Sequence, residues 1–190
     1  MERGYLFLLI GALLTASGLL PLNLNVIPFF SLEFFGYAMI LWGIREMRTS
    51  AKELRNANNF AIITLGLRFI FPLIVVLVRP IIPAYFLGFF PMLIAFFSVG
   101  IFFWLFKAEY MWSPHTSKRV DWLMYSVISL IYLVIYGIFM LPMISVRILP
   151  QNAVEIFRFI TFLYYAVLIY ILVKLYLDAR GNRPGFKRWG

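Results

Sequence analysis

The chain of 190 residues contains no cysteine and a single histidine, and only 13% of its residues are charged. The lack of cysteine excludes disulfide bonds and thiolate metal sites. The histidine, His115, follows Ser113 and Pro114 without neighbouring ligand residues, so we interpret it as a solvated loop residue and predict no metal site. With so few charges, the chain has too little polar surface to cover a water-soluble globule of this size.

Hydrophobic residues make up 63% of the chain, and they are gathered into long uncharged runs. A helix of roughly 17 to 25 apolar residues crosses the hydrocarbon core of a bilayer. Broken at their Pro and Asn clusters, the runs predict helices over 5–20, 30–46, 60–78, 84–106, 122–146 and 154–177. The sequence therefore predicts an all-α polytopic membrane bundle of six transmembrane helices with three outward hairpins. Residues 1–190 are expected to form a single integral membrane domain, because no polar stretch is long enough for a separate one.

Positive charge is concentrated at one side of the predicted membrane, as it is in cytoplasmic loops. The residues concerned are Arg3, Arg45, Arg48, Lys52, Arg55, Lys107, Lys118, Arg119, Lys174, Arg180, Arg183, Lys187 and Arg188. Both termini are thus predicted to be cytoplasmic, in a multi-pass protein of the cell membrane. The N-terminal run has a faint signal-peptide shape, but we interpret it as the first membrane helix. The net charge of +9 flanks apolar helices, which favours lipid headgroups as partners and not nucleic acid.

Four of these cations, Arg45, Arg48, Lys52 and Arg55, are spaced by three, four and three residues. That spacing predicts one face of a helix continuing from 30–46, which suits contact with anionic lipid headgroups. These four cations can act as an ordinary determinant of membrane topology or as a regulatory lipid switch. We favour the role in topology.

Small residues recur in the first two predicted helices. Gly4, Gly11 and Gly18 are seven residues apart, as are Gly36 and Gly43. Such stripes let two helix backbones approach closely, so these glycines are predicted to form a packing seam inside the fold. The alternative, which we favour less, is a seam against a partner subunit. A small-xxx-small pair, Ala12 and Ala16, lies on a neighbouring face of the first helix.

Arg68 is the most informative residue, because it falls near the middle of the predicted third helix. A charge at that depth costs about 2.5 to 3.5 kcal/mol on insertion scales and is normally paired. Pro72, four residues on, also releases the carbonyl of Arg68 from the helix ladder. Glu33 and Glu155 are the acids expected on the outer side.

We predict an outward-facing site for an anionic or amphiphilic group, since Arg prefers planar carboxylate or phosphate partners. Its expected residues are Arg68, Glu33, Arg158, Glu155, Tyr132 and Tyr136, with Thr161 and Tyr164 nearby. The alternative is that Arg68 and Glu33 form a structural ion pair. Glu155 follows Asn152 at the capping-box interval and Glu33 follows Ser31 at a helix start, so helix capping alone explains both acids.

No pattern of catalytic chemistry is present: there is no acid dyad, His cluster, Gly-rich phosphate loop or Ser beside a base. No cofactor is predicted. An enzyme that transfers lipid phosphates without metal ligands remains a third option.

The segment from Pro28 to Arg45, followed by Phe60 and Ala61, resembles a pattern in small bacterial multi-pass proteins without an assigned function. In size, helix count, cytoplasmic termini and the Ala12/Ala16 pair, the chain also resembles the substrate-capture subunits of energy-coupling factor vitamin transporters. That resemblance implies that Ala12 and Ala16 meet a transmembrane coupling subunit. No vitamin-binding signature accompanies it.

These observations favour a transport or substrate-binding membrane subunit as the first hypothesis. A noncatalytic structural or regulatory subunit with a membrane protein partner is the second, and a lipid-modifying enzyme the third.

Overall fold

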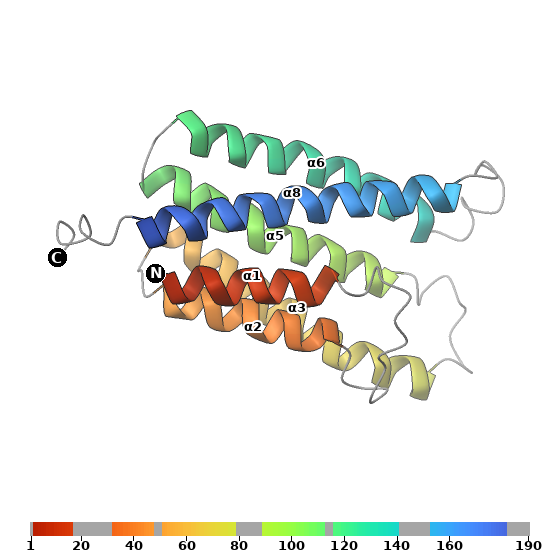
Figure 1. Ribbon diagram of the computed structural model, residues 1–190. Helices are drawn as coiled ribbons and strands as arrows, with labels where there is room; N and C mark the ends of the chain where they lie inside the picture. The colour runs from red at the N-terminus through yellow and green to blue at the C-terminus, as the bar shows by residue number, and fades with distance from the viewer. Residues whose placement is uncertain are drawn as a thin grey trace.

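The computed structural model describes residues 2–16, 32–47, 51–78, 89–112, 116–140 and 153–181. These residues are all-α and form six helices in chain order (Figure 1). The helices are α1 (Glu2–Ala16), α2 (Leu32–Glu46), α3 (Lys52–Val78), α5 (Phe89–Trp112), α6 (Thr116–Met140) and α8 (Ala153–Gly181). The expectation of an all-helical bundle is therefore confirmed for the described part of the chain.

The six helices form a closed ring. Each helix packs against its neighbours in the sequence, and α8 returns to pack against α1. Gly4 lies against Gly43 while Gly11 lies against Gly36, so α1 and α2 are antiparallel. The same alternation continues around the bundle, and the start of α1 and the end of α8 lie at the same end (Figure 1). We call this the terminal end, and the opposite one the far end.

Four of the helices are long and apolar enough to cross a membrane. These segments are Lys52–Val75, Phe89–Trp112, Thr116–Phe139 and Glu155–Gly181, and between 11% and 39% of each apolar window is buried inside the bundle. Apolar side chains thus cover much of the outer surface, where lipid and not water suits them. These helices indicate a multi-pass membrane protein. The described parts of α1 and α2 have 15 residues each, and six spans with cytoplasmic termini stay a prediction.

Helix α6 shows this arrangement most clearly. Its inward face carries polar groups at helical spacing, with Asp121, Tyr125 and Ser129 all buried. Its outward face carries Val127 and Leu130, whose side chains are exposed. Polar residues inside and apolar residues outside reverse the order of a water-soluble helix, and this order is the one that a lipid environment favours.

Several helices extend further toward the terminal end than the apolar runs do. Helix α3 begins at Lys52 and not at residue 60, α6 begins at Thr116 and not at 122, and α5 continues to Trp112 beyond 106. An apolar run marks only the part of a helix that lies in the hydrocarbon. The helix can continue beyond it into the interface, because Lys, Glu, Arg and Ala have a high helix propensity. The expected parts 17–20, 30–31, 84–88 and 141–146 lie outside the described residues.

The predicted cationic stripe does not lie on one continuing helix. Helix α2 ends at Glu46 and α3 begins at Lys52. The chain has to reverse between them, because α3 packs back against α2. Arg45, Lys52 and Arg55 are exposed at the terminal end, whereas Arg48 lies outside the described residues. Contact of these cations with anionic lipid stays a prediction.

The glycine stripes bring the backbones of α1 and α2 into direct contact. A Cβ atom built on Gly11 would lie 2.6 Å from the carbonyl oxygen of Gly36, and one on Gly36 would lie 2.8 Å from that of Gly11. Gly4 and Gly43 face each other in the same way, while Gly18 lies outside the described residues. Any side chain larger than hydrogen would therefore push the two helices apart.

We expect Gly36→Ala to lower the free energy of unfolding by roughly 1 to 3 kcal/mol, because the added methyl group meets backbone that cannot rotate away. Gly66 on α3 is the matched control, since nothing lies within 4 Å of a Cβ atom there. Gly66→Ala should be neutral or stabilising by up to about 1 kcal/mol, because alanine is the better helix former. Reversible unfolding in detergent micelles measures both, and equal stability of the two variants would contradict a tight seam.

Candidate functional site

A hollow that is partly open to the outside lies inside the ring and is lined by residues of all six helices. Hydroxyl groups and one guanidinium dominate its lining. The polar residues are Thr15 of α1, Tyr37 of α2, Arg68 of α3, Ser98 of α5, Tyr132 and Tyr136 of α6, and Tyr164 and Tyr165 of α8. The sequence had singled out Arg68, Tyr132, Tyr136 and Tyr164, and the fold brings these four together in the same hollow.

Arg68 is held by neighbours on two sides. Its guanidinium forms an ion pair with Glu33, which ties α3 to α2. Its Cζ atom also lies 5.6 Å from the centre of the Tyr37 ring, a distance that allows cation–π attraction. The Tyr37 hydroxyl in turn lies 2.6 Å from the Ser98 hydroxyl of α5. The Arg68 side chain nevertheless keeps 31% of its surface exposed, so these contacts do not enclose it fully.

The guanidinium also has spare hydrogen-bonding capacity. Its Nε atom is buried and has no hydrogen-bond partner among the described residues. Arg carries five N–H donors, and a site in a low dielectric favours filling them. At least one N–H donor of Arg68 is therefore unused within the described part of the bundle.

The tyrosines on α6 and α8 form a stacked wall. The rings of Tyr132 and Tyr164 are 4.4 Å apart and nearly parallel, at 11°. The Tyr164 hydroxyl lies 2.9 Å from that of Tyr125, which donates to the carbonyl oxygen of Val99. A molecule in the hollow would therefore meet flat aromatic surface and neutral donors together.

Two of the expected site residues lie elsewhere. Glu155 and Arg158 are exposed on the first turns of α8, and neither lines the hollow. Helix α8 begins at Ala153, so Glu155 falls in its first turn, where a carboxylate interacts favourably with the helix dipole. Among the described residues, the lining of the hollow thus contains one charged side chain, Arg68, whose counterion is Glu33. Two further arginines, Arg79 and Arg147, lie outside the described residues.

Pro72 and Pro91 lie at different positions in their helices. Pro72 lies inside α3, four residues beyond Arg68, and so leaves the Arg68 carbonyl without its helical donor. Pro91 lines the hollow but falls in the first turn of α5, which begins at Phe89. Proline is tolerated in a first turn because no N–H donor is needed there. Pro142 lies outside the described residues.

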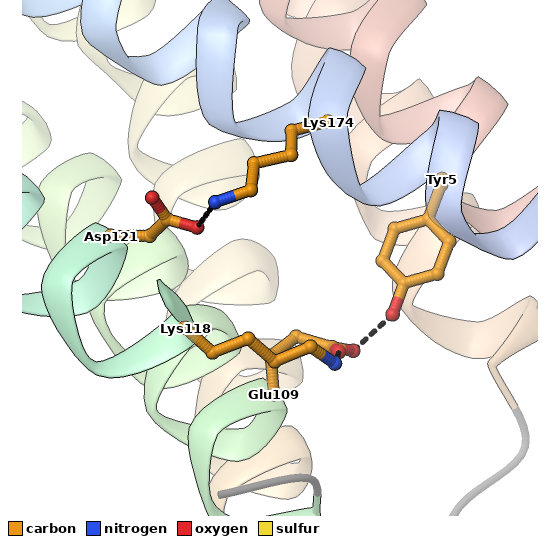
Figure 2. Close-up of polar contacts among 5 residues, drawn as sticks. All are labelled: Tyr5, Glu109, Lys118, Asp121 and Lys174. Atoms are coloured by element: carbon orange, nitrogen blue, oxygen red, sulfur yellow. Dashed lines mark hydrogen bonds and ion pairs between the residues drawn. The ribbon is translucent and has the colours of Figure 1, made fainter. Parts of the chain in front are cut away.

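A second polar cluster occupies the terminal end, and sequence reasoning missed it (Figure 2). The Glu109 carboxylate of α5 accepts hydrogen bonds from the Tyr5 hydroxyl of α1 and, at 3.0 Å, from the Lys118 ammonium of α6. Beside it, Lys174 of α8 donates to Asp121 of α6 at 2.6 Å. We call these five residues the ionic layer. It joins four of the six helices, and both of its acids are buried.

The sequence did contain a signal for the ionic layer. Phe102, Leu105 and Phe106 are buried core residues of α5, and Glu109 follows them at the spacing of the same helical face. An acid on an apolar face is costly unless it is paired, so a buried partner is expected. Lys118 had been interpreted as a topology determinant alone.

An apolar layer separates the hollow from the ionic layer. Its members are fully or almost fully buried and come from α1, α2, α5 and α8: Leu8, Ile40, Leu105, Ile171 and Leu172. Tyr125 of α6 is also fully buried at this level. The hollow is therefore closed toward the terminal end by packed side chains.

The packing of the bundle bears on the expected contact of Ala12 with a partner subunit. This residue is fully buried within the chain itself. Ala16, in contrast, is partly exposed at the described end of α1. The side chain of Ala12 therefore has no surface for a partner subunit in this arrangement.

Comparisons with protein-family models, with curated proteins and with solved structures found no match. No family is identified. Among the described residues, no group of three His, Asp or Glu side chains is placed to hold a metal ion.

We expect Lys118→Met to lower the free energy of unfolding by about 3 kcal/mol, because it leaves the buried Glu109 carboxylate without its cation. The double variant Glu109→Gln with Lys118→Met should recover most of that loss, since the uncompensated charge is gone. Unfolding in detergent micelles of the wild type, both single variants and the double variant gives the coupling energy. Additive effects of the two substitutions would show that the pair contributes little.

Proposed function

We propose that the protein is a six-span membrane protein that binds a small anionic or amphiphilic molecule in the hollow, as a transport or substrate-binding subunit. The observation that carries the proposal is the position of Arg68, which lines a hollow enclosed by helices with apolar outer faces. Charged residues inside a membrane bundle are costly and are commonly functional.

The composition of the lining supports binding over simple packing. A guanidinium whose task is only to fix helix register is best enclosed by its partners, because every exposed donor forgoes a hydrogen bond. Arg68 is instead partly exposed, and Tyr132, Tyr136 and Tyr165 line the hollow together with it. Concave sites lined by aromatic side chains with a few polar groups are typical of small-molecule binding.

A noncatalytic structural or regulatory subunit is the second candidate function. The ion pair between Arg68 and Glu33 favours it, because the pair balances its own charge without any ligand. In that case the hollow would be a packing gap, and added small molecules would not stabilise either the wild type or a variant of Arg68. A lipid-modifying enzyme is third, with no arrangement of reactive groups to favour it.

The proposed orientation places the termini in the cytoplasm and the mouth of the hollow on the outer side. Because the chain has no cysteine, single cysteines can report it without background. We expect a membrane-impermeant maleimide to label Ser145→Cys, between α6 and α8, in intact cells. It should label Ser117→Cys, at the exposed start of α6, only after lysis. The reverse pattern would invert the orientation, and labelling of both positions in intact cells would exclude an odd number of crossings between them.

Ligand binding can be tested with benzoate, a planar aromatic carboxylate, and with its neutral isostere benzamide. We expect one or both to raise the unfolding temperature of the wild-type protein in nanodiscs, since a ligand that binds the folded state stabilises it by mass action. Arg68→Met should abolish the benzoate shift, because the methionine keeps bulk but offers no donors.

Arg158→Met is the matched control, because Arg158 is exposed on α8 and outside the hollow. It should leave the benzoate shift intact. If neither probe stabilises the wild type at millimolar concentration, or if Arg68→Met and Arg158→Met respond alike, the binding function is contradicted and the structural alternative is favoured.

A further inference from the structure

Aromatic rings dominate the lining of the hollow. Half of its lining residues are Tyr or Phe, whereas aromatic residues make up 19% of the whole chain. Leu, Ala and Pro each contribute a single residue to the lining. The hollow is therefore enriched in rings and poor in aliphatic side chains.

Four of these rings form a continuous wall across α6 and α8. The ring centres of Tyr136 and Tyr132 are 5.5 Å apart. Tyr132 stacks on Tyr164, and the Tyr165 ring meets that of Tyr164 edge to face at 5.2 Å. We call these four residues the tyrosine wall. The ring of a bound molecule can extend such a cluster by offset stacking or edge-to-face contact, which stabilises aromatic pairs beyond the burial of their area.

The tyrosine wall and Arg68 act on the same space. Both line the hollow, and Tyr136 and Tyr165 lie within electrostatic range of the guanidinium. The Nε atom of Arg68 is also a donor without a partner among the described residues. One small molecule can therefore contact the wall with a ring and Arg68 with an anionic group.

An acyl chain suits this hollow less well than a ring does. Methylene groups gain from the burial of their area but make no ring–ring contact. The apolar layer closes the hollow toward the terminal end, so a long chain has no path along the bundle in that direction. The lining therefore favours a short molecule that carries a ring over a lipid tail.

We propose that the ligand of the hollow is a planar aromatic monoanion, whose ring packs against the tyrosine wall and whose anionic group accepts hydrogen bonds from Arg68. This inference rests on the proposed function and narrows its ligand to one chemical class. Arg68 orients the molecule, because it is the single charged side chain among the described residues that line the hollow. The tyrosine wall selects the ring.

Isothermal titration calorimetry with wild-type protein in nanodiscs can separate recognition of a ring from recognition of apolar bulk. Benzoate and cyclohexanecarboxylate have the same charge near neutral pH and the same number of heavy atoms, but only benzoate is flat and aromatic. Cyclohexanecarboxylate has the larger apolar surface, so burial of area alone would favour it. We expect benzoate to bind roughly three- to tenfold more tightly, because ring–ring contacts add to burial. Octanoate, an acyl chain with the same charge, should also bind more weakly than benzoate.

Variants of the tyrosine wall test whether its rings cause this preference. Tyr132→Leu keeps an apolar side chain but removes one ring of the stacked pair, so the preference for benzoate should fall below about twofold. Tyr132→Phe keeps the ring and should keep the preference. Tyr136→Leu, at a partly buried position of the wall, gives a second test if Tyr132→Leu fails to fold. Tyr170→Leu is the matched control and should change nothing, because Tyr170 is exposed on α8 and is not among the lining residues.

The inference and the proposed function fail in distinguishable ways. If cyclohexanecarboxylate or octanoate binds the wild type as tightly as benzoate, the hollow is a binding site but the aromatic class is wrong. A preference for benzoate that persists in both Leu variants would likewise overturn the inference. If none of the three carboxylates binds, the proposed function itself is contradicted.

Discussion

The constraint on which this structure depends is that charge within a membrane bundle has to be balanced locally. An isolated guanidinium among apolar helices costs several kcal/mol, and the fold meets that cost by bringing Glu33 of α2 against Arg68 of α3. The pair requires α2 and α3 to be neighbours in a fixed register. Phe34 and Phe69, the next residues along each helix, come into ring contact in that register. Charge balance and helix packing therefore depend on the same alignment.

The two ends of the bundle meet this constraint differently. At the terminal end, the ionic layer pairs two buried acids with two lysines and one tyrosine hydroxyl, and the acids are almost completely enclosed (Figure 2). Nearer the far end, a single ion pair stays partly exposed beside a hollow. An enclosed, fully paired network stabilises one arrangement of helices, whereas a partly exposed pair can accept another partner. The difference in enclosure is the physical basis for assigning packing to one cluster and binding to the other.

Features that depend on residues close together in the sequence can be predicted from it, whereas features that depend on contacts between distant residues cannot. The glycine seam and the pairing of Arg68 with Glu33 follow from spacing along single helices and from the scarcity of charge, so both could be anticipated. The ionic layer depends on Tyr5 and Glu109, which are more than a hundred positions apart and meet because the ring closes between α8 and α1. No local pattern encodes that closure. The position of Glu155 and Arg158 outside the hollow has the same origin, because depth along a helix can be estimated from sequence whereas the direction of a side chain around the ring cannot.

The closed ring also explains why binding and structural roles for Arg68 are compatible. In the absence of a ligand, the pair with Glu33 fixes α2 to α3, and the Tyr37 ring with its contact to Ser98 extends that support to α5. If an anion replaces Glu33, the guanidinium keeps a counterion and the Tyr37 contact, so the register of α3 need not change. What changes is the tie between α2 and α3, which is weakened when Glu33 no longer pairs with Arg68. Helix α2 is also held by its glycine seam with α1, so the bundle can exchange the partner of Arg68 without losing the ring.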